Sequence, residues 1–364
     1  MAGHGARPQM LVLARESRNW TQAQVAAVMA KVSGGQASQG YVSRAELGRL
    51  TVTGERLGVY AAALGYPPEL LLVDPGSPEV GVGLVHHRKK ASLGALSLRC
   101  VHAQLVLARL QIDGLAGAVG YDLQAHEVPR VELDALTTAK DAARRVRRQW
   151  RMPAGPVDDV IAVLEEAGVL VAVRELAGPR LDAVSQFDGV RAPLVLLASG
   201  APADRRRFSL AHELGHLVMH HAPGDAVQEK EADAFAAEFL MPARDIRAAL
   251  TADVSLARLA ELKQTWGVSM AALLKRAQTL NTLTEWQYRS AMAEMSALGY
   301  RTSEPVDLPI EQPHAVGRLA DLAVKQSPGL ERAASCALLL PEEFATLYAP
   351  QHGAALSCVQ EARP

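Results

Sequence analysis

The sequence predicts a mostly α-helical protein with a small β-sheet, an α+β fold. Apolar residues recur every three or four positions through most of the chain, which is the period of an amphipathic helix. Strand-like apolar runs gather in one stretch, between residues 169 and 197. Only 4% of the 364 residues are aromatic, and this length leaves room for two or three domains with buried cores.

Changes in pattern divide the chain into five predicted segments. The first linker begins at Asp74-Pro75-Gly76-Ser77-Pro78, a cluster of residues typical of turns. The predicted segments are an N-terminal five-helix domain at 1–73, a basic linker with a long helix at 74–135, a domain at 136–245 that contains the strand-like runs, a helical extension at 246–305, and a C-terminal segment of unknown role at 306–364.

The N-terminal segment has the pattern of five short helices. The first is predicted over residues 10–18, and Thr21 is a suitable N-cap for the second. Ser38 begins the third, which runs to Gly48 with Val42, Ala45 and Leu47 predicted to pack inward. Two further helices are expected at 53–64 and near 68–72.

The third helix carries side chains suited to a DNA groove. Gln39, Tyr41, Ser43 and Arg44 are of the types that contact base edges and phosphates. A helical module that binds another protein would show a similar pattern, so both interpretations stay open.

The same segment resembles the Xre-type helix-turn-helix. The resemblance lies in Thr21-Gln22 at the start of the second helix, Ser38-Gln39 at the start of the recognition helix, and Ser43-Arg44-x-Glu46-x-Gly48 at its end. It implies binding to double-stranded DNA, with contacts from Thr21, Gln22, Ser38, Gln39, Tyr41, Ser43 and Arg44. The sequence differs from the pattern in having extra residues, about 31–37, which predict a lengthened turn.

Two basic runs, at residues 86–90 and 144–148, are interpreted as solvated faces, and the first is placed to add phosphate contacts beside the helix-turn-helix. Between them, residues 91–119 predict one long helix, which would serve as a dimer contact or an interdomain strut.

Strands are expected at 169–173, 183–187 and 192–197, and an edge strand of this sheet is suited to holding an extended peptide.

An HExxH motif lies in the run Phe-Ser-Leu-Ala-His-Glu-Leu-Gly-His-Leu-Val-Met-His-His at residues 208–221. His212 and His216 are four residues apart, so on a helix they share one face and can bind a single Zn²⁺. Glu213 would lie beside the metal, where a carboxylate can take a proton from water. Gly215 would let another backbone come close. The alternative is a pair of hydrogen-bonded core histidines.

The third metal ligand must come from outside this motif, since catalytic zinc usually has three protein ligands. Met219 and Ala222 exclude the HExxHxxGxxH pattern. The next predicted helix, 228–242, offers Glu229 as ligand and Asp233, one turn later, as the group that binds the other ring nitrogen of a ligand histidine.

Other polar residues near the motif are weaker candidates. Glu231 and Glu238 compete with Glu229, but Glu231 lies about 200° around the helix from it. A solvated acidic face is the alternative for the whole group. His220 lies four residues after His216, so one interpretation places it in the cleft or in contact with substrate. The favoured interpretation places His220 and His221 at an exposed helix end, where cations are favoured.

Residues 205–242 resemble the ImmA/IrrE family of zinc metallopeptidases. The resemblance rests on Arg-Arg-Arg-Phe-Ser-Leu-Ala-His-Glu-Leu-Gly-His and Glu-Ala-Asp-Ala-Phe-Ala-Ala-Glu-Phe-Leu-Met-Pro. It implies that His212, His216 and Glu229 bind the metal, that Glu213 is the catalytic acid and base, and that Asp233 occupies the family's Asn/Asp position. With the helix-turn-helix and a C-terminal portion found in fused proteins, the resemblance covers about residues 8–305.

These features predict a DNA-binding transcriptional regulator with a zinc-dependent endopeptidase domain that cuts a regulatory protein such as a repressor. Alternatives are a non-proteolytic transcription factor that senses zinc or a metabolite, and an antitoxin-like partner protein. One Zn²⁺ per chain is expected, although the same donors suit Mn²⁺ or Fe²⁺. Scattered cysteines (Cys100, Cys336, Cys358) and the lack of an apolar run long enough for a membrane predict a cytoplasmic protein without a membrane partner.

Overall fold

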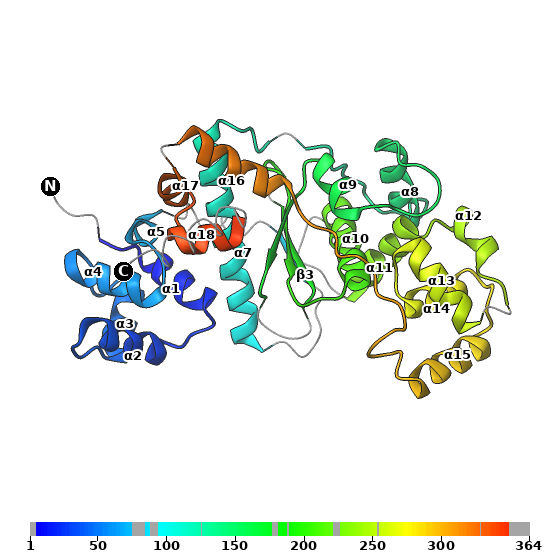
Figure 1. Cartoon of the computed structure of the whole chain (residues 1–364), viewed down its shortest axis with the longest axis horizontal. Helices are drawn as coiled ribbons and strands as arrows, with labels where there is room; N and C mark the ends of the chain where they lie inside the picture. Colours follow the sequence, from blue (N-terminus) through cyan, green and yellow to red (C-terminus); the bar gives the residue numbers. More distant parts are fainter. Residues whose placement is uncertain are drawn as a thin grey trace, which may run out of the picture.

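The structure is a computed structural model. It describes residues 5–74, 84–87, 94–124, 126–176, 181–187, 189–220, 226–252, 255–327 and 329–348, with the backbone alone for 84–87. Helices surround one small sheet, so the predicted mostly α-helical class with a small β-sheet is confirmed (Figure 1). No helix in these ranges is long and apolar enough to cross a membrane.

The N-terminal unit consists of α1 (Pro8–Ser17), α2 (Gln22–Ser33), α3 (Gln39–Glu46), α4 (Gly54–Leu64) and α5 (Pro68–Leu72), close to the five predicted helices. Thr21 caps α2 through a capping box with Gln24. The turn before α3 is shorter than predicted, because α2 continues to Ser33 and Gly34 ends it in a left-handed conformation, φ 64°.

The core of the N-terminal unit corrects one prediction. Val42 and Ala45 are fully buried, but Leu47 is 61% exposed, since it follows the last turn of α3 rather than lying on the inner face. A buried ion pair, Arg15 Nε to Glu46 Oε1 at 2.6 Å, joins α1 to α3.

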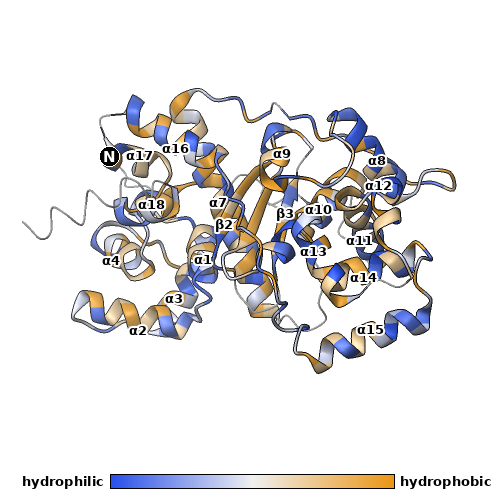
Figure 2. Cartoon of the chain, turned by 45° about the vertical axis from the view of Figure 1, so that its right-hand side comes forward, coloured by the Kyte–Doolittle hydropathy of each residue, from blue (hydrophilic) through white to orange (hydrophobic). Residues whose placement is uncertain are grey.

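The sheet contains β1 (Leu84–His87), β2 (Leu170–Arg174), β3 (Ala183–Phe187) and β4 (Leu194–Ala198), in the order β1-β3-β4-β2. β2 is parallel to β4, and the other neighbours are antiparallel. The strands β2 and β3 are largely hydrophobic and lie between helices (Figure 2). Three strands were predicted; β1 was missed, and it overlaps the basic run 86–90 only at His86 and His87. Consequently β3 is not an edge strand, because β1 pairs with its outer side.

The helices α9 (Val160–Glu166) and α10 (Ala203–Met219) pack on the sheet, and α11 (Ala226–Leu240) and α8 (Ala139–Gln149) pack on α10. α10 contacts α11, β3 and β4. The basic run on α8 is only partly a solvated face. Arg147 is buried and donates to the Phe239 carbonyl at 2.7 Å, because its guanidinium fills the space between α8 and the end of α11.

The next part of the chain extends this core. α12 (Ala243–Ile246), a short 3₁₀ turn (Arg247–Ala249), α13 (Leu256–Trp266), α14 (Met270–Thr279) and α15 (Glu285–Ala297) follow α11. Leu259, Leu273 and Leu274 are among their fully buried residues and belong to the same hydrophobic cluster as Leu210 and Phe239.

The long helix α7 (Ala95–Val119) links the N-terminal unit to the rest. It packs against α1, α16 (Ala315–Gln326) and α17 (Leu330–Cys336), while α18 (Pro341–Tyr348) packs on α17 (Figure 1). A Cβ on Gly114 would lie 2.0 Å from the Cys336 carbonyl oxygen, so glycine is required for this approach. An ion pair between Arg18 and Glu343 at 3.2 Å joins α1 to α18. This arrangement agrees with the strut alternative for the long helix.

Candidate metal centre

Three side chains converge where α10 and α11 pack together. The Nε2 atoms of His212 and His216 are 3.1 Å apart. Glu229 places Oε2 at 3.5 Å from His212 Nε2 and Oε1 at 3.4 Å from His216 Nε2. The histidines are 2% and 0% exposed. Residues from two helices thus present three ligand atoms to one point.

The close approach of α10 and α11 depends on Gly215. A Cβ at this position would lie 3.2 Å from Cβ, Cγ and Cδ1 of Phe235 on α11. The element that comes close is therefore an aromatic side chain, not the neighbouring backbone that the sequence suggested. Phe235 is fully buried, so the contact fixes the distance between the two helices.

The three ligand atoms fit a tetrahedral divalent cation. Ligand bonds of 2.0–2.1 Å at tetrahedral angles separate two ligand atoms by about 3.3 Å, close to the 3.1 Å between the two Nε2 atoms. Each Nε2 lies near a different oxygen of Glu229, at 3.5 Å for His212 and 3.4 Å for His216, and one ligand atom from each of the three residues lies within 4.8 Å of the others. Two imidazole nitrogens and a carboxylate are a donor set used by Zn²⁺ and by several other divalent ions. In the alternative of hydrogen-bonded core histidines, the same contacts would be hydrogen bonds within a metal-free cluster.

Asp233 holds His212 from the opposite side of its ring. Oδ1 lies 2.9 Å from Nδ1 of His212, which directs the Nε2 lone pair toward Glu229 and His216. Burial lowers the pKa of His212, but hydrogen bonds with Asp233 and Glu229 outweigh burial and raise it to about 9. Glu229 is half-buried, which by itself would raise its pKa, yet its hydrogen bonds to both histidines lower it.

His216 is held by a different arrangement, which corrects the prediction for His220. His220 is only 4% exposed, and its Nδ1 lies 2.8 Å from Nδ1 of His216. Its Nε2 lies 3.1 Å from Oε2 of Glu231. His220 therefore lies inside the site and not at an exposed helix end, because the chain leaves the helix there and turns the ring inward. His221 lies outside the described residues.

Glu213 lies beside the cluster in full burial, 1% exposed. Ser185 on β3 donates its hydroxyl to Glu213 Oε2 at 2.5 Å. Burial raises the pKa of Glu213 to about 7, although His212 and Ser185 partly oppose this. A carboxyl group with this pKa can both accept and return a proton near neutral pH. Ser185 was not singled out in the sequence, since a serine in a strand gives no local signal.

The remaining acidic candidate, Glu238, has a structural environment. Its Oε1 accepts from Arg144 Nε at 2.8 Å, and its Oε2 accepts from the buried Arg276. These contacts place Glu238 between α8 and α14, away from the histidines.

The DNA-contact candidates lie on and beside α2 and α3. Thr21 and Ser38 act as N-caps, accepting from the Gln24 and Tyr41 amides. Gln22 donates to Glu46 at 2.9 Å and accepts from Gln39 at 3.5 Å. Gln39 and Arg44 are exposed, and Tyr41 and Ser43 are half-buried. The Arg56 guanidinium lies 5.3 Å from the Tyr41 ring centroid.

Comparison with known proteins identifies part of the chain. No curated protein matches it. Residues 164–278 match the family model described as the IrrE N-terminal-like domain, Peptidase_M78. The matched residues include β2, β3 and β4 and the helices α10, α11, α13 and most of α14, and so contain the whole candidate metal centre. The match supports a metallopeptidase-type domain in this part of the chain, in agreement with the resemblance of residues 205–242.

Proposed function

We propose that the chain is a metal-dependent endopeptidase joined to a DNA-binding unit, and that it acts as a transcriptional regulator. The observation that carries the peptidase part is the convergence of His212, His216 and Glu229 beside a buried Glu213 held by Ser185. The match to a peptidase family over the same residues supports it.

In this mechanism the ligands are His212, His216 and Glu229, with Zn²⁺ as the expected ion. When bound there, the ion would polarise the scissile carbonyl and acidify the attacking water. Glu213 would accept the proton of that water and return it to the leaving amine. Ser185 would orient the Glu213 carboxylate, and Asp233 would hold the His212 ring. Exclusion of water around Glu213 keeps its pKa near neutrality.

The proposed substrate is an extended segment of a regulatory protein, such as a repressor. Ser185 places β3 next to Glu213, so a peptide strand aligned with this side of the sheet would lie near the site. Because β1 pairs antiparallel with β3 at one end of the sheet that the described residues form, such a peptide would either pair with the outer edge of β1 or replace it.

For the N-terminal unit we propose binding to double-stranded DNA through α3, with Gln39, Tyr41, Ser43 and Arg44 toward the groove. Support comes from two N-capped helices whose first turns are joined by Gln22 and Gln39 and from the exposure of Arg44. Thr21, Gln22 and Ser38 would stabilise these helix starts as well as face the phosphates.

The peptidase proposal is tested with a peptide library and mass spectrometry, using the full chain loaded with zinc and its Glu213→Gln variant. We expect cleavage at defined sites by the wild type and none by the variant, with equal zinc content in both. Cleavage that survives Glu213→Gln would contradict the assigned role of Glu213.

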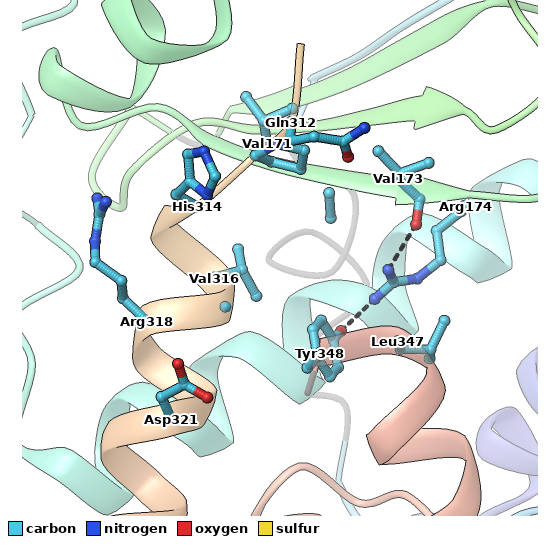
Figure 3. A pocket seen from close by; sticks show the side chains of 13 residues that line it. Val171, Val173, Arg174, Gln312, His314, Val316, Arg318, Asp321, Leu347 and Tyr348 are labelled. Carbon is cyan, nitrogen blue, oxygen red and sulfur yellow. Dashed lines mark hydrogen bonds between the residues drawn. The ribbon is translucent and has the colours of Figure 1, made fainter. Parts of the chain in front are cut away.

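A ligand-sensing transcription factor is the second candidate, and one cavity favours it. A hollow of about 450 Å³ lies between β2, α16 and α18, with Arg174, His314 and Arg318 among its lining residues (Figure 3). Its volume is within the range of small-molecule sites, and its cationic side chains outnumber the one acidic side chain, Asp321. The ligand class would be a small anion.

This cavity is connected to the N-terminal unit through α18. Tyr348, which accepts from Arg174 in the cavity wall, donates to Gln111 of α7 at 2.8 Å (Figure 3). Glu343 on the same helix pairs with Arg18 of α1. A change in DNA affinity of the Glu213→Gln variant on adding citrate or inorganic phosphate would favour the sensor, whereas no change would leave proteolysis as the function.

A further inference from the structure

We propose that His220 and Glu231 are positioning residues for the metal ligand His216, which they hold in one tautomer and one ring orientation. This inference rests on the proposed metal site. It assigns roles to two residues that belong neither to the HExxH motif nor to the three metal ligands.

The contacts form a continuous chain from α10 to α11. Nδ1 of His216 lies 2.8 Å from Nδ1 of His220, and Nε2 of His220 lies 3.1 Å from Oε2 of Glu231. His216 and His220 are 0% and 4% exposed, and the Glu231 side chain is 33% exposed. The two histidines are thus removed from water, while the carboxylate at the end of the chain remains partly solvated.

The protons can be placed in only one way when His216 binds a metal through Nε2. Its Nδ1 must then carry the hydrogen, so Nδ1 of His216 donates and Nδ1 of His220 accepts. A neutral His220 that accepts at Nδ1 has its hydrogen on Nε2, and this hydrogen is donated to Glu231. Each ring nitrogen in the chain then has a partner of the correct kind.

The backbone at the end of α10 is arranged for this contact. His220 follows the last helical residue and has extended torsions, φ −109° and ψ 132°. Arg130 donates to the carbonyl oxygens of Leu217 and His220 at 3.0 and 3.2 Å, which fixes the last turn of α10. The ring of His220 is therefore held from its own backbone as well as from Glu231.

Two carboxylates of one helix, α11, therefore orient the two ligand histidines, one by direct contact and the other through a third histidine. Asp233 contacts His212 directly at 2.9 Å, while Glu231 reaches His216 through the ring of His220. α11 thus supplies the ligand Glu229 and both orienting carboxylates within five residues. Groups that orient metal-bound histidines typically change metal affinity by about 10–100-fold when they are removed.

The first test is zinc affinity, measured by competition with a chelator on the full chain. His220→Phe keeps a ring of similar size but removes both nitrogens, and we expect it to weaken zinc binding by about 10–100-fold. Glu231→Ala should also weaken binding, whereas Glu231→Gln should recover much of the loss because its side-chain oxygen still accepts. The melting temperature of the metal-free variants separates loss of packing from loss of orientation.

A second test reads the tautomers directly. In the zinc-loaded chain labelled with ¹⁵N-histidine, long-range nitrogen–proton correlations should show the hydrogen on Nδ1 of His212 and His216 and on Nε2 of His220. The hydrogen of His220 on Nδ1, or unchanged zinc affinity in His220→Phe, would overturn this inference. If the wild type binds no zinc at all, the metal site itself is wrong, which is a different result.

Discussion

Two helix pairs in this protein use their polar side chains in opposite ways. α10 and α11 turn theirs inward, so that His212, His216 and Glu229 meet in a buried cluster and each histidine has an orienting partner. α2 and α3 use several polar groups as caps and links, and they present Gln39 and Arg44 to solvent.

This difference shows that a structure restricts the function of a buried polar cluster more than the function of an exposed helix face. Buried polar groups must be paired, so each contact around His212 and His216 restricts what the cluster can hold. Exposed side chains on α3 carry no such restriction, and they suit a DNA groove or a protein surface equally well. Paired contacts within the cluster therefore support the metal centre, whereas the resemblance and the helix arrangement support DNA binding.

The largest effect is expected on the free energy of unfolding, from the loss of a buried ion pair that holds α11 and involves none of the three metal ligands. Replacing Glu238 by Ala leaves the buried Arg276 without its carboxylate, and losing one partner of such a pair costs about 3–5 kcal/mol. Chemical denaturation of the metal-free chain would measure this loss. If Glu238 were a ligand instead, the folded variant would also lose zinc; we expect its zinc stoichiometry to be unchanged.

A smaller effect should follow from Ser185→Ala, which removes the hydroxyl that donates to Glu213. Hydrogen bonds to charged groups contribute about 1.5–3 kcal/mol, so we expect the cleavage rate to fall by about 10–100-fold. Zinc affinity should stay as in the wild type, since Ser185 contacts none of the three ligands in the described structure. Ser185→Thr keeps a hydroxyl and serves as the matched control.

On the outward-facing pair, Arg44→Ala should weaken DNA binding by about 1–3 kcal/mol. Fluorescence anisotropy would measure this with a duplex that the wild-type chain selects from a random pool. Arg145→Ala is the matched control, because Arg145 is also an exposed arginine but lies on α8. Equal affinity of both variants would remove α3 as the DNA-reading element.

The smallest effect concerns protons released on metal binding. Since the pKa of His212 is raised to about 9, its ring is protonated at pH 7 in the metal-free chain and must lose that proton to become a ligand. The pKa of His216 is lowered to about 4, chiefly by burial, so this ring is already neutral. Zinc affinity should therefore rise about tenfold per pH unit between pH 7 and 8. Calorimetry in buffers of different ionisation enthalpy would detect about one proton, and none would contradict the assigned state of His212.

Much of the fold could be predicted from local patterns. Helix periodicity and caps predicted α1, α3, α4, α5 and α11 close to their observed bounds, because residues such as Ser38 and Pro242 determine the chain locally. The start of α2 at the Thr21 cap was also predicted, but this helix continues to Ser33, and for α10 only the helical face of the HExxH motif was predicted. β1 could not be predicted in the same way, since its place in the sheet depends on pairing with β3, which is remote in sequence.

In the candidate site, too, the residues set by local spacing could be predicted from the sequence, and those set by packing could not. His212, Glu213 and His216 follow from helical spacing, and Glu229 from the next helix. Ser185 and the contact between His220 and Glu231 depend on how elements pack, which no spacing rule encodes. The i+4 spacing from His216 to His220 was a signal, but burial of the last turn of α10 was needed to interpret it.

The central claim is that His212, His216 and Glu229 hold one divalent cation. Metal content by mass spectrometry of the purified chain, beside the His212→Ala and Glu229→Ala variants, tests it most directly. We predict about one zinc per wild-type chain and loss of this zinc in both variants. A wild-type chain that contains no metal, and takes up none when zinc is added, would contradict the claim.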